Sequence, residues 1–379
     1  MAGRHDARLS MRWPQRPRAS RDGWRGSGCG QPRAPTMAPR PHQPGPTRVS
    51  RIIRLRKEKP SDLLDPDALL RRPGARLLVL APHPDDESLA AGGLIQRALG
   101  YGVPACVVFV TDGENNPWPQ RALERRVWIG PRQRRAWGAR RRDEADAALR
   151  VLGGGAVEVI RLGWPDGGVT WRLLDATVAS IAVFGTVIEN VRPTVLVLPD
   201  LADRHPDHSA VHVLLDMALR ALPGVAKPVC LGYLLHGRSH AGLPCRAVLA
   251  LNAGEQARKR GAIEAHASQV VLARRRLLRS AGPAESFVAG LTPQGTVGAR
   301  LPWLPPRPLR PCLRLLAVDA TGGERIRLQG RGRANVYWRD GSPAACTARA
   351  LQAPFYAKLY CPLPSPWVFD GWGWCRLDA

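Results

Sequence analysis

Residues 76–87 read RLLVLAPHPDDE. An apolar run that ends in a loop of polar side chains is typical of a buried parallel strand, because open α/β sheets carry their chemistry at the carboxyl ends of their strands. A second polar cluster, DRHPDH at residues 203–208, follows the apolar run TVLVL at residues 194–198. Two strands that each end in His and Asp predict one metal site at a single edge of the sheet.

Strands and helices alternate from about residue 75 onward. The pattern predicts strands at 76–80, 104–110, 157–162, 194–199, 229–235 and 247–252, and helices at 88–100, 140–152, 171–191, 208–221 and 255–267. Ser88 and Asp86 are the candidate N-caps of the first of these helices. This alternation predicts an α/β fold, a Rossmann-like three-layer sandwich with a mostly parallel sheet.

The pattern breaks near residues 285–305, where prolines become frequent. Beyond the break, short strand-like pieces at 325–328 and 335–338 predict a small β-rich C-terminal extension. We therefore expect a catalytic domain over residues 58–290 and an extension over 291–379. The extension is rich in tryptophan, which can build the core of a small β unit or bind pyranose rings; these residues are Trp303, Trp338, Trp367, Trp372 and Trp374.

The charge of the chain is unevenly spread. The net charge is +25, and residues 1–57 supply about half of it with fourteen Arg or Lys and few acids. This stretch is dense in Pro, Gly and Ser, so we expect a disordered tail that lacks the apolar core of a secretory signal. Its charge can attract phosphates, but no interleaved aromatics favour specific nucleic-acid binding. No apolar stretch approaches ~18 residues, so we expect no membrane span.

The eight cysteines show no C-x-x-C spacing, so a thiolate zinc site is disfavoured. Cys106 and Cys230 lie in apolar runs, where reduced core residues are expected. A cytoplasmic, reducing setting is the expectation that follows.

The two polar clusters hold a plausible set of metal ligands. His83 and Asp86 lie three residues apart in one tight loop, and His208 can complete the set from the other loop. Two imidazoles and one carboxylate suit Zn²⁺, one ion per chain, although Fe²⁺ or another divalent metal also fits. The alternative is structural, since a lone His–Asp pair often caps a helix and Asp86 can do so here.

A metal site of this kind is suited to amide hydrolysis, in which the metal activates a water. That reaction also needs a base and a group that stabilises the developing oxyanion. Asp85, beside a ligand, is the candidate general base. His205 is the candidate for stabilising the oxyanion and protonating the leaving amine, and Asp207 for orienting His205.

The two polar clusters resemble those of a known family. Residues 81–87, followed by Gly92 and Gly93, and residues 204–208 resemble the two signatures of the LmbE/PIG-L family of zinc-dependent N-acetylglucosaminyl deacetylases. The resemblance covers about residues 74–275. Weaker similarities are TDGE at 111–114, GWPDG at 163–167 and AHASQ at 265–269.

The resemblance implies zinc ligation by His83, Asp86 and His208, with Asp85 as base and His205 as electrostatic catalyst. It also implies that Arg141 and Asp166 hold sugar hydroxyls. Arg141 lies in a run of three arginines, so a neighbour can take its role or all three can form a solvated face. Asp166 can instead cap a turn.

The implied reaction is removal of an N-acetyl group from an N-acetylglucosamine-containing sugar conjugate. Two alternatives remain: a deacylase of a longer N-acyl group or another amide on a glycoside natural product, and an inactive carbohydrate-binding protein. The basic insert at residues 114–140, with Trp118, Trp128 and Trp137, is either a lid or a solvated loop. Nothing in the sequence supports a particular oligomer.

Overall fold

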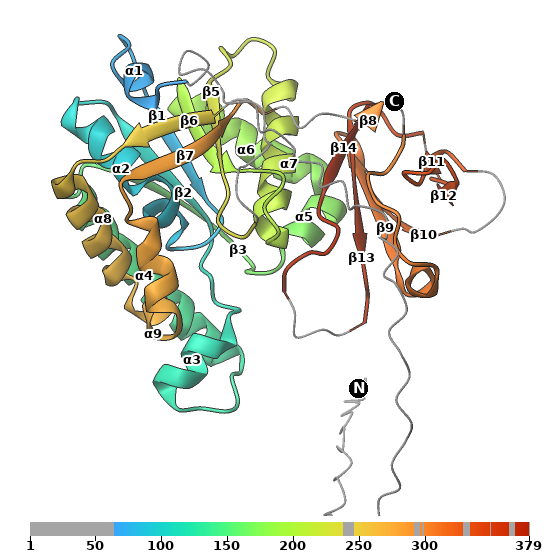
Figure 1. The fold of residues 1–379 in the computed structure, drawn as a ribbon, viewed down its shortest axis with the longest axis horizontal. Helices are drawn as coiled ribbons and strands as arrows, with labels where there is room; N and C mark the ends of the chain where they lie inside the picture. The colour runs from blue at the N-terminus through green and yellow to red at the C-terminus, as the bar shows by residue number, and fades with distance from the viewer. Residues whose placement is uncertain are drawn as a thin grey trace, which may run out of the picture. The chain divides into compact units, whose positions relative to one another are not determined.

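The computed structural model describes residues 64–237, 246–291, 296–297, 299–328, 334–348, 350–363 and 368–378 (Figure 1). The predicted basic tail, residues 1–57, lies outside these ranges, as does Trp367.

A seven-stranded sheet forms the middle layer, in the order β3-β2-β1-β4-β5-β7-β6. Its strands are β1 (Leu77–Ala81), β2 (Ala105–Thr111), β3 (Glu158–Trp164), β4 (Val195–Pro199), β5 (Val229–Tyr233), β6 (Arg246–Ala250) and β7 (Ala284–Ala289). The first five are parallel, and β7 runs antiparallel to both β5 and β6. Because β1, β2 and β4 are buried on both faces, their sequences are continuous apolar runs. The predicted mostly parallel sheet is confirmed.

Helices cover both faces of this sheet (Figure 1). One face carries α2 (Asp86–Gly100), α4 (Pro131–Gly153) and α8 (Ala253–Ala265), and the other carries α5 (Val169–Asp175), α6 (Thr177–Val191) and α7 (Pro206–Ala221). The side chains of β1 alternate between the two cores: Leu78 and Leu80 pack with α6 and α7, whereas Leu77 and Val79 pack with α2 and α4. The three-layer prediction is confirmed.

Two predicted helices differ from the structure. Helix α4 begins at Pro131 rather than at residue 140, with Gly130 as N-cap and the Gln133 side chain accepting the Gly130 N–H. Proline suits the first helical position and arginine is a good helix former, so the arginine-rich stretch is helical rather than a loop. The predicted helix at 171–191 is two helices, α5 and α6, bent by 112°.

Within the described residues up to 291, three α-helices and one strand were not predicted. The helices are α1 (Pro66–Leu70), α3 (Pro117–Glu124) and α9 (Ala267–Leu277). The strand is β7, which falls at the proline-rich break and contains Glu285. A charged residue in a central strand argues against a strand in the sequence alone, but Glu285 is buried in an ion pair with Lys259.

A second sheet lies in the C-terminal part, in the order β10-β9-β13-β14-β8. Its strands are β8 (Thr296–Val297), β9 (Arg314–Asp319), β10 (Gly322–Arg327), β13 (Phe355–Tyr360) and β14 (Cys375–Asp378), beside the short pair β11 (Val336–Tyr337) and β12 (Pro343–Ala345). One face shares the core of α6 and α7 through Leu316, Val318 and Tyr356. The β-rich C-terminal part is thereby packed onto the α/β layers.

Most tryptophans of this part build its interior. Trp338 and Trp374 are buried, and Trp303 and Trp372 are partly buried against the smaller core. Cys106 and Cys230 are likewise buried and free, as expected of reduced core residues.

Within the described residues, no single helix has the length and apolarity needed to cross a bilayer. The bent pair α5 and α6 meets that test when the two are taken together.

Candidate metal and catalytic site

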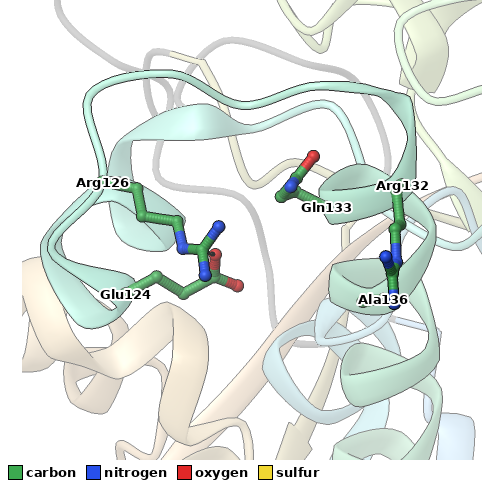
Figure 2. A pocket seen from close by; sticks show the side chains of 5 residues that line it. All are labelled: Glu124, Arg126, Arg132, Gln133 and Ala136. Carbon is green, nitrogen blue, oxygen red and sulfur yellow. Dashed lines mark ion pairs between the residues drawn. The ribbon is translucent and has the colours of Figure 1, made fainter.

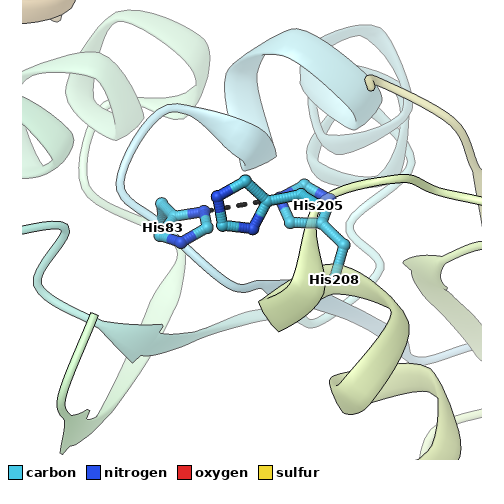
Figure 3. Close-up of side chains that lie close together, drawn as sticks. All are labelled: His83, His205 and His208. Atoms are coloured by element: carbon cyan, nitrogen blue, oxygen red, sulfur yellow. Dashed lines mark hydrogen bonds between the residues drawn. The ribbon is translucent and has the colours of Figure 1, made fainter. Parts of the chain in front are cut away.

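The two polar clusters meet at one edge of the sheet. Strand β1 pairs in parallel with β4, so the loop after each strand emerges at the same edge. His83 lies in the loop after β1 and Asp86 begins α2 directly after it, while His205 and His208 lie at the start of α7, after β4. Figure 3 shows the rings of His83, His205 and His208 gathered at this point.

Three buried ligand atoms form a nearly equilateral triangle. Asp86 Oδ2 lies 3.3 Å from His83 Nδ1 and 3.2 Å from His208 Nε2, and the two nitrogens are 3.3 Å apart. Ligands bound tetrahedrally at 2.0–2.1 Å would be separated by about 3.3–3.4 Å, so this spacing fits a zinc site. The three predicted ligands are thus brought together.

The surroundings of this triangle favour positive charge. Burial alone would lower the pKa of His208, but Asp86 and Asp203 outweigh it and raise this pKa to about 10. The carboxylate of Asp86, though buried, has its pKa held well below its usual range by His208 and His83. A cation bound here would satisfy the same carboxylates.

Each ligand imidazole has a carboxylate on its outer nitrogen. His208 Nδ1 lies 3.3 Å from Asp203 Oδ2, and His83 Nε2 lies 3.2 Å from Asp166 Oδ1 and 3.4 Å from Asp207 Oδ2. Carboxylates in this position orient a metal-binding imidazole and raise its basicity. Such support is expected of ligands rather than of helix caps.

The Asp207 carboxylate faces His83 rather than His205, the residue that it was predicted to orient. Its carboxylate accepts hydrogen bonds from the backbone N–H groups of Gly167 and Val169, at 2.7 and 3.1 Å, and faces His83. Its link to His205 runs through the backbone instead, because the Asp207 N–H donates to His205 Nδ1 at 3.3 Å. The reason is local: His205 is the N-cap of α7, and Pro206 and Asp207 form its first turn.

His205 stands beside the ligand triangle. Its ring centroid is 4.6 Å from that of His83 and 5.2 Å from that of His208. Since Nδ1 accepts the Asp207 N–H, the proton of the neutral ring is on Nε2, which leaves a donor. Burial, and then the neighbouring His83, His208 and His236, hold the pKa of His205 well below its usual range.

Asp85 occupies an unusual backbone conformation in the same loop. Its φ is 131°, in the region that favours glycine, and it rather than Ser88 or Asp86 is the N-cap of α2. Its side chain makes no capping bond, so the carboxylate stays available. Burial raises the pKa of Asp85, opposed by Arg141, whose Nη2 lies 3.4 Å from Oδ1. Strained residues of this kind cluster at functional sites.

Glu87 stabilises this conformation of Asp85. Its Oε2 accepts the Asp85 backbone N–H at 3.0 Å, while its Oε1 lies 2.9 Å from His266 Nε2. Both Glu87 and His266 are fully buried. His266 therefore supports the loop rather than binding a metal, and nearby Ser268 closes α9 onto α4 by donating to Glu144 at 2.5 Å.

Arg141 alone of its arginine run points inward. It is 3% exposed and donates to the carbonyls of Pro84 and Gly113, at 2.5 and 2.8 Å. Arg140 pairs with Glu144 and Arg142 with Asp112, both away from the loop after β1. Arg141 thus fastens the loop that carries Asp85. Asp166 accepts the Asn115 N–H at 2.8 Å and faces His83.

The basic insert forms α3 and the first turns of α4. A pocket of about 590 Å³ lies between them. Figure 2 shows Glu124 and Arg126 on one side of it and Arg132 on the other. None of its lining residues belongs to the histidine cluster, which consists of His83, His205, His208 and His236. Trp118 and Trp128 are exposed, whereas Trp137 is buried, so one of the three tryptophans anchors the insert.

Asp203 and His236 also lie beside the ligand triangle, although neither was assigned a role from the sequence. Asp203 accepts the backbone N–H groups of His205, Leu235 and His236, at 2.9, 2.9 and 3.1 Å, and so joins the loops after β4 and β5. The His236 ring lies 4.8 Å from that of His208. The signal was the position of His236 just beyond a third parallel strand, the same edge at which the other ligands lie.

Part of the chain is similar in sequence to known proteins. Residues 78–219 match the family model described as PIG-L, GlcNAc-PI de-N-acetylase. A 1D-myo-inositol 2-acetamido-2-deoxy-alpha-D-glucopyranoside deacetylase of Mycolicibacterium gilvum is 32% identical over 168 residues, 38% of this chain and 55% of that protein. The Streptomyces avermitilis protein of the same name is 32% identical over 172 residues, 41% of this chain and 55% of that protein. The chain thus spans a little over half the length of these curated relatives.

Solved structures are similar as well. The N,N'-diacetylchitobiose deacetylase of Pyrococcus horikoshii matches with a TM-score of 0.45 and 19% identity, over 57% of this chain and 83% of that one. A conserved protein of Thermus thermophilus matches with a TM-score of 0.40 and 25% identity, over 61% of this chain and 100% of that one.

Proposed function

We propose that this chain, which carries a PIG-L-type domain at residues 78–219, is a zinc-dependent deacetylase of an N-acetylglucosamine-containing sugar conjugate. The observation that carries the proposal is the convergence of His83, Asp86 and His208 on one point, with Asp85 next to Asp86 in the chain and the His205 ring 4.6 Å from that of His83. The named activity of the curated relatives, which act on a 2-acetamido-2-deoxy-glucopyranoside, supports this substrate class.

The donor set fits zinc best, one ion per chain, with Fe²⁺ as the divalent alternative. His83, Asp86 and His208 would hold it: all three are buried, and each of the two imidazoles has a carboxylate beside its other nitrogen. Zinc, when bound, supplies Lewis-acid chemistry: it lowers the pKa of a coordinated water and polarises an amide carbonyl.

The other steps belong to residues of the chain. Asp85 takes the proton of the attacking water, a role suited by the raised pKa of its carboxyl. His205 donates from Nε2 to the oxyanion that forms when the water oxygen bonds to the amide carbon. When the carbon–nitrogen bond breaks, the Asp85 carboxyl returns its proton to the leaving amine, and acetate is released.

Proton return by Asp85 replaces the sequence-based assignment of that step to His205. The lowered pKa of His205 disfavours the charged imidazole that such a donor needs. Asp207 is proposed to act on His83, and Arg141 to position Asp85. Contact of Arg141 and Asp166 with sugar hydroxyls remains part of the proposal.

The wider assignments follow from the same premise. We propose residues 58–290 as the deacetylase domain, residues 291–379 as an extension, and a reducing compartment such as the cytoplasm, which the free buried cysteines support. A longer N-acyl group is the alternative substrate. A carbohydrate-binding protein without activity is disfavoured, because binding alone gives no reason to hold Asp85 at a φ of 131°.

The test is metal analysis of the purified chain, with acetate release measured on a panel of N-acetylglucosaminides. We expect about one zinc per chain, loss of activity on chelation and recovery on adding zinc back. His208→Ala should lose both metal and turnover. A wild-type chain that binds zinc but releases no acetate or longer acid from any N-acylglucosaminide would overturn the proposed activity.

A further inference from the structure

The loop before β14 reaches the histidine cluster from the C-terminal sheet. The Phe369 ring lies 5.3 Å from the His236 ring at 30° and 6.1 Å from the His205 ring at 77°. Phe369 is half-buried in this position. The PIG-L match ends at residue 219, so this contact comes from outside the matched region.

Three polar interactions hold the loop at this position. The Asp370 N–H donates to the Arg204 carbonyl at 2.8 Å, and Arg204 Nε donates to the Asp370 carbonyl at 3.1 Å. The Asp370 carboxylate accepts from Lys358 Nζ at 2.5 Å. Lys358 lies on β13 and is 3% exposed, and a buried ammonium group needs such a partner. The placement of Phe369 is therefore fixed by both the C-terminal sheet and the loop that carries His205.

Phe369 approaches the histidine cluster from a different element than Asp166 and Arg141, the two residues proposed to contact sugar hydroxyls. Asp166 follows β3 and faces His83, while Arg141 comes from α4 and faces Asp85. Phe369 meets the cluster at His205 and His236 instead. If the sugar hydroxyls lie toward Asp166 and Arg141, the acyl group on the other side of the amide lies toward the apolar ring.

We propose that Phe369 forms the acyl-side wall of the deacetylase site and limits the length of the acyl group that the enzyme removes. This inference rests on the proposed function and adds to it a specificity-determining residue supplied by the C-terminal sheet. A ring packed against His205, the residue proposed to hold the oxyanion, would tolerate a short acyl group and exclude longer chains by overlap.

The experiment compares wild type, Phe369→Ala and the neighbouring control Val368→Ala, whose side chain is 58% exposed. Each is assayed on two glucosaminides with the same aglycone, one N-acetylated and one N-butyrylated. The readout is the ratio of kcat/KM for the butyryl substrate to that for the acetyl substrate. Because both values come from one preparation, the ratio does not depend on the fraction of folded or zinc-loaded protein.

We expect the ratio to rise about tenfold in Phe369→Ala, the discrimination typical of small apolar differences in a pocket, and to stay within about twofold of wild type in Val368→Ala. A ratio that does not rise in Phe369→Ala, while wild type hydrolyses the acetyl substrate, overturns the acyl-wall assignment alone. A wild type that hydrolyses neither substrate overturns the proposed function, and the acyl assignment falls with it.

A second readout needs no activity. In zinc-free protein, Phe369→Leu removes the ring current at the two neighbouring imidazoles, so the NMR signals of His205 and His236 should shift, and those in Val368→Ala should not. Unmoved histidine signals in Phe369→Leu would overturn the contact itself.

Discussion

Two aspartates stand side by side where the loop after β1 meets α2, and we propose different roles for them. Asp86 turns its carboxylate to His83 and His208, and their attraction keeps the pKa of this group low. Asp85, with a φ of 131°, has its carboxylate 3.4 Å from Arg141, and burial raises its pKa. Environment thus distinguishes the proposed metal ligand from the proposed general base, although the two side chains are chemically the same.

Asp85→Asn should therefore lower kcat by about 10²–10⁴-fold, the usual contribution of a general base, without loss of zinc. Asp146→Asn is the matched control, since the Asp146 side chain is 40% exposed and pairs with Arg161. Acetate release and zinc content are measured on the same samples. Full activity in Asp85→Asn would remove it from the base role.

Gly113 shows how closely Arg141 is packed. A Cβ added at Gly113 would lie 1.8 Å from Arg141 Nη1, whereas one added at Gly102 meets nothing within 4 Å, and both glycines have a positive φ of 65–68°. Gly102→Ala should cost about 1–2 kcal/mol from backbone strain alone. Gly113→Ala should cost more and also lower kcat, because Arg141 must move away from Asp85. Equal effects of the two substitutions on unfolding and turnover would contradict this account.

At the scale of elements, a buried ion pair joins α8 to β7 beneath α2. Lys259 Nζ lies 2.5 Å from Glu285 Oε1, each side chain is 1% exposed, and Glu285 also accepts the backbone N–H groups of Gly93 and Leu94. A Cβ at Gly93 would lie 2.4 Å from Leu251, so the glycine lets α2 approach this layer. The glycine pair that follows the first signature thus serves packing near the loop that bears His83.

Breaking this pair from one side should be costly. Lys259→Met or Glu285→Gln leaves its partner buried, and each should lower the free energy of unfolding by about 3–5 kcal/mol. The double substitution should cost less than the two together. Glu264→Gln, in the exposed pair with Arg274, should cost under about 1 kcal/mol. Urea unfolding checks these values, and additive losses in the double variant would argue against direct coupling.

At the scale of the whole described chain, the C-terminal sheet is joined to α7 through a buried hydroxyl. Tyr356 Oη donates to Asp216 Oδ2 at 2.5 Å. Burial raises the pKa of Tyr356 well above its ordinary value, and Asp216 adds to this effect. The same sheet places Phe369 against His205, so its docking bears on both stability and the site.

The raised pKa predicts a stability change at high pH. The contribution of neutral Tyr356 is complete below its unfolded pKa of about 10 and is lost as the pH rises toward the higher folded value. Above pH 10, Tyr356→Phe should lose stability less steeply than wild type, by about 1.4 kcal/mol per pH unit. Tyr337→Phe is the exposed control. Parallel curves for wild type and Tyr356→Phe between pH 8 and 11 would refute the prediction.

The sequence alone determined the sheet, its edge and the identity of the metal ligands as candidates. Apolar runs such as Leu77–Ala81 can be buried only in the middle of a layered sheet, and polar residues directly after parallel strands must emerge at one edge. These conclusions need only local pattern and chain direction. Residues 111–114 and 163–167, which resembled weaker family features, likewise begin at the carboxyl ends of β2 and β3, at that edge.

The tertiary structure decided which neighbours each polar group has. Asp207 faces His83 rather than His205, Arg141 rather than Arg140 points inward, and Phe369 reaches the cluster from far along the chain. Such contacts depend on side-chain direction and on the packing of elements distant in sequence, which no local pattern encodes. Burial then sets the pKa of each group, because the cost of removing a charge from water depends on everything packed around it.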